Sequence, residues 1–419
     1  MRTVEIGPVP PAERTQSAFD LFLIFVGANI VATTLQVGAS LSSAFSLTAV
    51  FGLIGAGAVA GAALVGALAP LGPRLGVPSV IAARAALGIR GAGVVAGVLY
   101  LTNFAWIAVN NVIAASACAR VAGGSGSERV WAVALGVVAT LVVAKGPRAV
   151  GLADRFAVPL LAVVGVVVTV ACLRLPSAAI ATEPSGDLSW SRGLDVVIGY
   201  QVSWVLMFAD YSRYTPSPRR SAAAVFLGLA LTSLWFMPLG AVAARAAGSS
   251  DPGAMLSAVG LGSWGAVLLA VATLTTNFVN IYLSSLAWKS LFPATGDQTS
   301  VWSIGLIGSA LGILSTAWLD RYVEFMLVLG NILVPVGGVM LAHYFVGPAR
   351  WQMAPERIET EVARLYEPSG PYATHRGFSI AGVVAWTAGA IVYHVSEAIG
   401  GTLPALGATI VVYVSLRRR

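Results

Sequence analysis

The chain has 419 residues, of which 57% are hydrophobic and only 10% are charged, and its mean hydropathy is +0.83. Soluble domains carry about a quarter charged residues. The composition therefore excludes an ordinary soluble domain and predicts an integral membrane protein. The net charge of +7 could indicate nucleic-acid binding, so the positions of the charges have to be considered.

Apolar runs of roughly 20 residues, the length that spans a bilayer as a helix, predict about twelve transmembrane helices. They lie near 18–40, 48–71, 93–119, 129–146, 153–174, 194–212, 221–246, 264–289, 300–319, 322–346, 379–397 and 402–416. These runs are too long for barrel strands. The expected fold is an all-α bundle in the lipid bilayer.

The loop charges predict the topology. With both termini in the cytoplasm, most Lys and Arg residues fall on the inner side, as the positive-inside rule requires. The arginines expected outside are Arg120, Arg129, Arg174, Arg192, Arg245 and Arg321. The positive net charge is thus explained by the Lys and Arg residues of the inner loops, and no nucleic-acid partner is expected. Residues 1–17 lack the features of a signal peptide, so we expect a multi-pass, monomeric protein of the cell (inner or plasma) membrane.

Two of the predicted helices are interrupted by polar and small residues. Helix 1 carries Asn29, Thr33, Thr34 and Gln36 in its middle, and helix 6 carries its own cluster around Gln201. Two such helices five spans apart are typical of transporters with inverted repeats and a site at the membrane midplane. The predicted parts are a cytoplasmic N-terminal segment (1–17), a first five-helix repeat (18–174), an inverted second repeat (190–346), a cytoplasmic linker (347–378) and helices 11 and 12 (379–416), which we expect to be peripheral.

The most distinctive stretch lies in helix 3, from Thr102 to Asn111, and reads TNFAWIAVNN. Asn103, Trp106 and Asn110 share one helical face. Carboxamides buried in hydrocarbon are costly unless something pairs with them, and a planar ligand with donors and acceptors on its edge would be such a partner. Trp106 taken alone fits simple packing better than a stacking role, and the two flanking amides are what favour a binding site.

Helix 8 carries a second cluster, with Thr275, Thr276 and Asn280. The two threonines, with backbone carbonyls of Ala32 and Leu35 on helix 1 and of Ala272, would supply the oxygens of a sodium site. These helices hold no deep carboxylate, which favours sodium over a proton as the coupling ion, although a proton remains an alternative. The simpler interpretation is that the threonines bond to their own backbone or join helices.

Other functional classes find less support in the sequence. No nucleophile or acid–base pair accompanies the amides, hydroxyls and indoles, so an enzyme is not expected. Cys118 and Cys172 are isolated in apolar surroundings, and we interpret them as packing residues. A channel is disfavoured because large stacking side chains and amides would bind too specifically for fast conduction. A membrane protein that binds a ligand without transporting it remains an alternative.

Three short motifs resemble the nucleobase–cation symporter-1 family. They are GPVP at Gly7 to Pro10, ADYSRY at Ala209 to Tyr214 after helix 6, and TTN at Thr275 to Asn277 in helix 8. The helix spacing is similar over nearly the whole chain, whereas motif identity is confined to these patches. The resemblance implies the inverted five-helix-repeat fold with two extra helices. It also implies sodium- or proton-coupled uptake of a flat heterocycle by alternating access.

The resemblance also implies roles for individual residues. Trp106 matches the family's stacking tryptophan. Asn103, Asn110 and Gln36 match positions that bind substrate, and Asn280 lies close to the helix 8 asparagine. Ala32, Leu35, Ala272, Thr275 and Thr276 match the sodium ligands.

The chain departs from the family at Gln201, where an aromatic commonly covers the second face of the ring. Either Trp204 replaces that aromatic, or the ligand stacks on one face and Gln201 binds its edge. Cytosine is the expected substrate. Hydroxymethylpyrimidine, purines, hydantoins and allantoin are alternatives.

Overall fold

The computed structural model describes residues 6–122, 127–181, 183–292, 294–314, 320–346 and 355–417, and every regular element in these ranges is a helix. At some helical positions, among them Ala272 and residues 147–158, it describes the backbone alone. The all-α class expected from the sequence is confirmed.

The described helices follow the predicted apolar runs closely. In chain order they are η1 (Pro11–Glu13), α1 (Ala18–Asn29), α2 (Ala32–Ser42), α3 (Leu47–Leu68), α4 (Leu71–Leu75), α5 (Ser79–Leu87), α6 (Ile89–Ala122), α7 (Glu128–Ala144), α8 (Pro147–Leu173), α9 (Ser177–Ile180), α10 (Trp190–Val202), η2 (Ser203–Leu206), α11 (Phe208–Ser212), α12 (Pro218–Ala247), α13 (Pro252–Ala258), α14 (Gly262–Leu291), α15 (Asp297–Leu314), α17 (Tyr322–Leu341), η3 (Ala342–Val346), α18 (Pro355–Tyr366), η5 (Pro371–Ala373), α19 (Thr374–Gly377), α20 (Ile380–Val395) and α21 (Thr402–Arg417).

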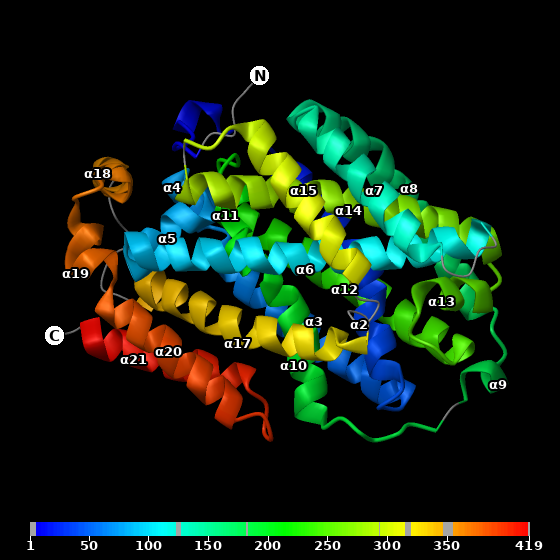
Figure 1. Cartoon of the computed structure of the whole chain (residues 1–419). Coiled ribbons are helices and arrows are strands. Elements are labelled where there is room, and N and C mark those ends of the chain that lie inside the picture. The colour runs from blue at the N-terminus through cyan, green and yellow to red at the C-terminus, as the bar shows by residue number, and fades with distance from the viewer. Residues whose placement is uncertain are drawn as a thin grey trace.

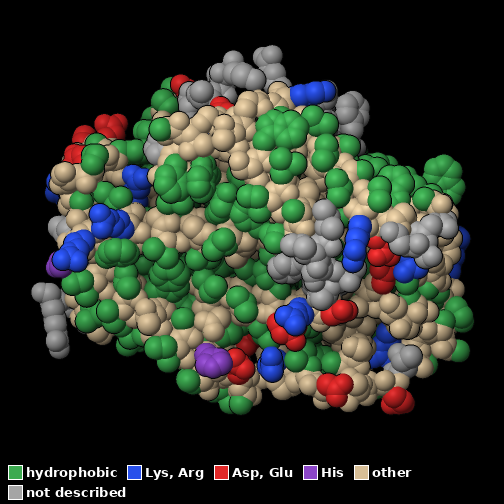
Figure 2. Space-filling model, in the orientation of Figure 1, with side chains coloured by type: hydrophobic (Ala, Val, Ile, Leu, Met, Phe, Trp, Pro, Cys, Tyr) green, Lys and Arg blue, Asp and Glu red, His purple; other side chains and the backbone are tan. Residues whose placement is uncertain are grey.

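Within the described ranges, six helices are long and apolar enough to cross a membrane, and α1 with α2 makes a seventh if the bent pair counts as one span. The other predicted runs are helical but shorter or less apolar, and the run at 300–319 ends in residues outside the described ranges. The number twelve and the inverted repeat therefore stay predictions. Figure 2 shows hydrophobic side chains over much of one face, with charged side chains mainly around its margins and lower part.

Both helices that the sequence predicted to be interrupted are broken. The axis bends by 53° between α1 and α2. The sixth run is divided into α10, the 3₁₀ turn η2 and the short helix α11. These breaks put non-helical backbone deep inside the bundle, which is tolerated at membrane depth only where protein or a cavity surrounds it.

Close packing of small residues fixes α2 against α12. A Cβ at Gly38 would overlap the carbonyl oxygen of Met237, and one at Gly240 would overlap that of Leu35. Such backbone contact is typical of membrane helices, where small residues let two helices approach. It anchors the half of the first broken helix that follows the break.

The long helix α6 runs through the middle of the molecule, with α14 beside it (Figure 1). The pair α20 and α21 packs on α17 at the outside of the bundle. Only 22% of the apolar window in the span that ends with α20 (His375–Val395) is buried, against 56–67% in the other five candidate spans. This exposure agrees with the peripheral position expected for the last two helices.

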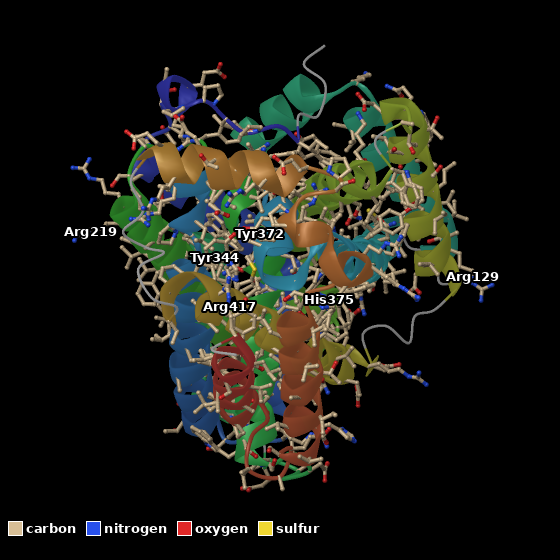
Figure 3. The ribbon with its side chains drawn as sticks, turned by 90° about the vertical axis from the view of Figure 1, so that its left-hand side faces the viewer. Arg129, Arg219, Tyr344, Tyr372, His375 and Arg417 are labelled. Carbon is tan, nitrogen blue, oxygen red and sulfur yellow. The ribbon has the colours of Figure 1, made fainter. Side chains whose placement is uncertain are left out.

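The N-terminal segment, α4, α5 and α18 gather at one end of the molecule, which Figure 3 views end-on. Tyr366 of α18 donates a hydrogen bond of 2.6 Å to the carbonyl oxygen of Ile6. Arg14 donates to the carbonyl oxygens of Val9, at 2.8 Å, and Pro73, at 2.5 Å. Burial raises the pKa of Tyr366 to about 12, so its hydroxyl remains a donor at neutral pH. These contacts tie the described part of the N-terminal segment to the helical bundle.

Candidate functional site

A cavity of about 540 Å³ lies where the two broken helices face α6, α8 and α14. Its polar lining groups are uncharged hydroxyls, amides and indoles. The lining residues are Leu23, Ile24, Gly27, Ala28, Val31, Thr33, Trp106, Asn110, Pro159, Leu161, Tyr200, Ser203, Trp204, Met207, Tyr211, Thr275, Thr276, Val279, Asn280 and Leu283. This volume and lining are of the kind that binds small, largely apolar molecules with a few polar edges.

The first helix break forms one wall of the cavity. Val31 is extended, with φ −140° and ψ 163°, so carbonyls near it lose their helical partners. Thr34 donates from Oγ1 to the carbonyl oxygen of Asn29 at 2.5 Å, and Tyr322 of α17 donates to that of Thr33 at 2.8 Å. Side-chain hydroxyls thus replace the missing backbone bonds, as buried carbonyls require.

The second break is held in a similar way. Ser203 donates to the carbonyl oxygen of Tyr200 at 2.7 Å, and the Tyr200 hydroxyl lies 2.6 Å from Oγ1 of Thr34. This last hydrogen bond joins the two breaks directly. Trp204 and Met207, at this second break, line the cavity.

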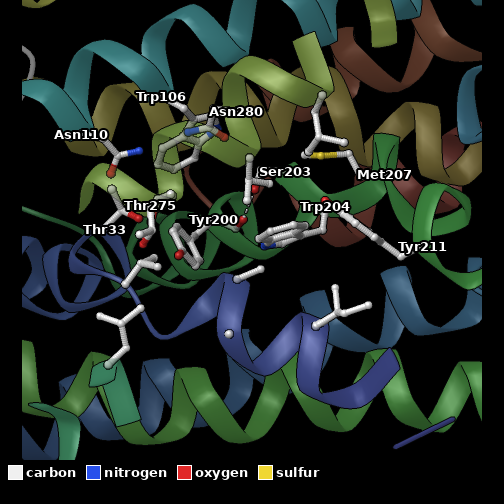
Figure 4. A pocket seen from close by; sticks show the side chains of 18 of the residues that line it. Thr33, Trp106, Asn110, Tyr200, Ser203, Trp204, Met207, Tyr211, Thr275 and Asn280 are labelled. Atoms are coloured by element: carbon white, nitrogen blue, oxygen red, sulfur yellow. Dashed lines mark hydrogen bonds between the residues drawn. The ribbon is translucent and has the colours of Figure 1, made fainter. Parts of the chain in front are cut away.

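Four of the predicted substrate residues meet at the cavity: Trp106 and Asn110 on α6, Asn280 on α14 and Trp204 in η2. Figure 4 shows Trp106, Asn110 and Asn280 on one side of the space, with Trp204 and Tyr200 across from them. Asn110 is 1% exposed, and neither polar atom of its amide has a partner among the described residues. A buried amide in this state is a ready partner for a ligand edge.

Tyr200 lines the cavity but was not among the candidates from the sequence. Its ring meets that of Trp106 edge-on, with centroids 5.8 Å apart and planes at 84°. The available signal was its position one residue before Gln201, where an aromatic was expected. Together with Trp204, it supplies aromatic surface opposite Trp106.

The structure does not bring Gln36, Asn103 or Gln201 to the cavity lining. Gln201 turns toward α12 and α3, where Nε2 donates to Oγ of Ser233 at 3.0 Å. Successive helical residues are about 100° apart, so the lining position of Tyr200 directs Gln201 elsewhere. Gln36 and Asn103 are 0% and 1% exposed, and their amides have no partner among the described residues.

The predicted sodium ligands are only partly gathered. Thr275 and Thr276 line the cavity, and Ala32 and Leu35 lie buried in the first turn of α2. The carbonyl oxygen of Leu35 lies against Gly240 of α12. The side chain of Ala272 is outside the described residues.

Long apolar helices around an uncharged cavity at two helix breaks define a multi-pass membrane protein of the transporter class. Residues 8–415 match the family described as permeases for cytosine/purines, uracil, thiamine and allantoin. The chain belongs to this family, as the motif resemblance implied. Its relatives are permeases and not enzymes.

Individual relatives are similar over most of the chain. The cytosine permease of Escherichia coli strain K12 is 25% identical over 350 residues, which are 83% of this chain and 82% of the relative. The inward-facing conformation of Mhp1 has a TM-score of 0.85 at 20% identity, covering 98% of this chain and 92% of Mhp1. Closed Mhp1, a nucleobase-cation-symport-1 transporter with bromovinylhydantoin bound, has a TM-score of 0.82 at 20% identity, with coverages of 99% and 96%.

Proposed function

We propose that the protein is a cation-coupled symporter that takes up a neutral, planar nucleobase-like heterocycle by alternating access. The observation that carries the proposal is the grouping of Trp106, Asn110, Trp204 and Asn280 around one cavity at both helix breaks. Indoles stack on a flat ring, and amides can both donate to and accept from its edge.

The uncharged lining supports a neutral ligand. A charged ring would enter a cavity whose described polar groups are amides, hydroxyls and indoles, and burying an unpaired charge is far more costly than burying a hydrogen-bonded neutral edge. Cytosine is the first candidate, since a cytosine permease is among the similar proteins. Hydroxymethylpyrimidine, hydantoins, allantoin and purines share the same chemistry and are alternatives.

We propose sodium as the coupling ion, bound near Thr275 and Thr276 with help from carbonyls of Ala32, Leu35 and Ala272. The two hydroxyls at the cavity support this position. The Leu35 carbonyl lies against Gly240 of α12, a position without a side chain that would cover this oxygen. A proton is the alternative coupling ion.

We further propose that the cavity opens to the cytoplasm. Its lining includes Leu23, Ile24, Gly27 and Ala28 of α1, before the first break, and Tyr211 of α11, after the second. With both termini in the cytoplasm, these are the inner halves of the two broken helices.

Uptake into proteoliposomes tests the proposal. Radiolabelled cytosine, uracil, hypoxanthine, allantoin and hydantoin are each offered under a sodium gradient, a proton gradient or none. We expect one or more to accumulate above its equilibrium level with sodium and to lose this accumulation when the gradient is collapsed. If no heterocycle accumulates under either gradient, the proposed function is wrong.

A further inference from the structure

Two buried asparagines next to the cavity lie in the sequence motifs but have no role in the proposed site. Asn111 ends the polar stretch of α6, and Asn277 ends the TTN motif of α14. Each is 1% exposed. Nδ2 of Asn277 donates to Oδ1 of Asn111 at 2.8 Å and reaches the carbonyl oxygen of Ile107 at 3.4 Å.

These hydrogen bonds cross between the two helices that carry most of the proposed site. α6 and α14 pack side by side (Figure 1). Asn111 directly follows Asn110, and Asn277 directly follows Thr276. A rotation of either helix that broke the bridge would therefore also turn a proposed substrate residue or a proposed ion residue.

The bridge has little room to rearrange. A Cβ at Gly312 of α15 would lie 3.2 Å from Cβ of Asn111, and one at Gly136 of α7 would lie 3.1 Å from its Nδ2. The α7 and α15 helices thus approach Asn111 closely at these two glycines, where a larger residue would leave less room. The Asn111 side chain is therefore closely packed by α7 and α15 on the sides away from α14.

Stability alone does not explain this pair. Nδ2 of Asn111 and Oδ1 of Asn277 have no partner among the described residues. Each buried polar atom left unsatisfied lowers stability, whereas an apolar pair of the same shape is nearly neutral or stabilising. What the amide bridge adds, and an apolar pair would lack, is a directional bond that specifies one helix rotation.

We propose that Asn111 and Asn277 are positioning residues. Their bridge holds the face of α6 that carries Trp106 and Asn110 at a fixed rotation against Thr276 of α14, and it transmits ion binding to the substrate face. The inference rests on the proposed function, since it concerns the link between that site's two ligands.

The test compares Asn111→Leu, Asn277→Leu and the double variant with the wild-type protein. Dissociation constants for cytosine, uracil, hypoxanthine, allantoin and hydantoin are measured with and without sodium on the purified full-length chain, together with thermal stability. Thr140→Val is the matched control, because among the described residues this buried threonine of α7 bonds within its own helix, to the carbonyl oxygen of Gly136, at 2.7 Å.

Each single variant is expected to lose stability because it leaves one amide unpaired. The double variant is expected to regain wild-type stability, since both amides are gone. Its ligand affinity, however, should lose the dependence on sodium: a wild-type enhancement in the range of about 5–150-fold should fall toward one. Thr140→Val should keep the wild-type enhancement.

The outcomes separate the two proposals. If the double variant binds a heterocycle with the full sodium enhancement, the amides only join helices and the inference is overturned. A wild-type protein whose ligand affinity does not respond to sodium overturns the inference and leaves heterocycle transport intact. A wild-type protein that binds none of the five compounds overturns the proposed function and this inference with it.

Discussion

At the scale of single residues, Trp106 lies between the cavity and helix α17. Its ring lines the cavity and packs edge-on against Phe325, at 5.1 Å between centroids, and Tyr322, at 6.4 Å. Neighbouring aromatics therefore pack around the indole, while part of it lines the cavity, where a ligand could stack on it. This arrangement distinguishes a stacking role from simple packing in a way that an experiment can measure.

Trp106→Ala should weaken heterocycle binding by about 1–3 kcal/mol, the usual contribution of one aromatic stacking contact, which is roughly 5- to 150-fold in the dissociation constant. Trp106→Phe should lose less. Trp264→Ala is the matched control, because this tryptophan is 80% exposed at the start of α14. Isothermal titration of detergent-purified protein measures all three. Unchanged affinity in Trp106→Ala would show that the ring only packs.

Thr276→Ala should reduce the sodium stimulation of uptake, because it removes one of the proposed ion ligands at the cavity. The change should appear as a higher sodium concentration for half-maximal uptake, by roughly tenfold for the loss of about 1.4 kcal/mol. Thr409→Val in α21 is the control, since within the described part of the chain its hydroxyl bonds to Ala405 of the same helix. An unaltered sodium response in Thr276→Ala would place the ion elsewhere.

At the scale of elements, hydrogen bonds from tyrosines hold the broken helices in place. Tyr322 joins α17 to the first break, and Tyr200 joins the second break to the first. Both hydroxyls are buried with their partners, so the breaks have a defined geometry without ligand. The cavity is therefore formed by helix packing before anything binds in it.

Tyr322→Phe should keep the packing on Trp106 but leave the Thr33 carbonyl without its donor, at a cost of about 1–3 kcal/mol. We expect lower thermal stability and altered heterocycle affinity. Tyr344→Phe provides the comparison, because it removes a similar bond, of 2.7 Å, to the carbonyl oxygen of Ala82. The comparison variant should lose stability and keep its affinity. Equal affinity in the two variants would argue against a link between Tyr322 and the site.

At the scale of the whole molecule, the segments at its two ends differ, and their charges predict how the protein is oriented in the membrane. The N-terminal segment, α4, α5 and α18 gather at one end, and α9 and α13 lie at the other (Figure 1). The loop charges predict that the first end lies in the cytoplasm. The side of the membrane to which the cavity opens depends on this orientation.

Single cysteines test the orientation in a background where Cys118 and Cys172, both free thiols, are replaced by alanine. Ser250→Cys, just after α12, should react with a membrane-impermeant maleimide added to intact cells. Pro216→Cys, just before α12, should react only after the membrane is opened. Both positions are exposed. The reverse labelling pattern would invert the predicted topology and turn the cavity toward the outside.

The sequence by itself determined the helical class, the family and the two interrupted helices, because apolar length and polar residues within apolar runs are read directly from residue order. It also identified Trp106, Asn110, Trp204 and Asn280, whose indoles and amides stand out in an apolar chain. Only the tertiary structure decided which side chains face the cavity. One residue along a helix turns a side chain by about 100°, so Tyr200 lines the cavity while Gln201 faces α12. Likewise, the bridge between Asn111 and Asn277 depends on how α6 and α14 are rotated against each other, which follows from the packing of α7 and α15 and not from either motif alone.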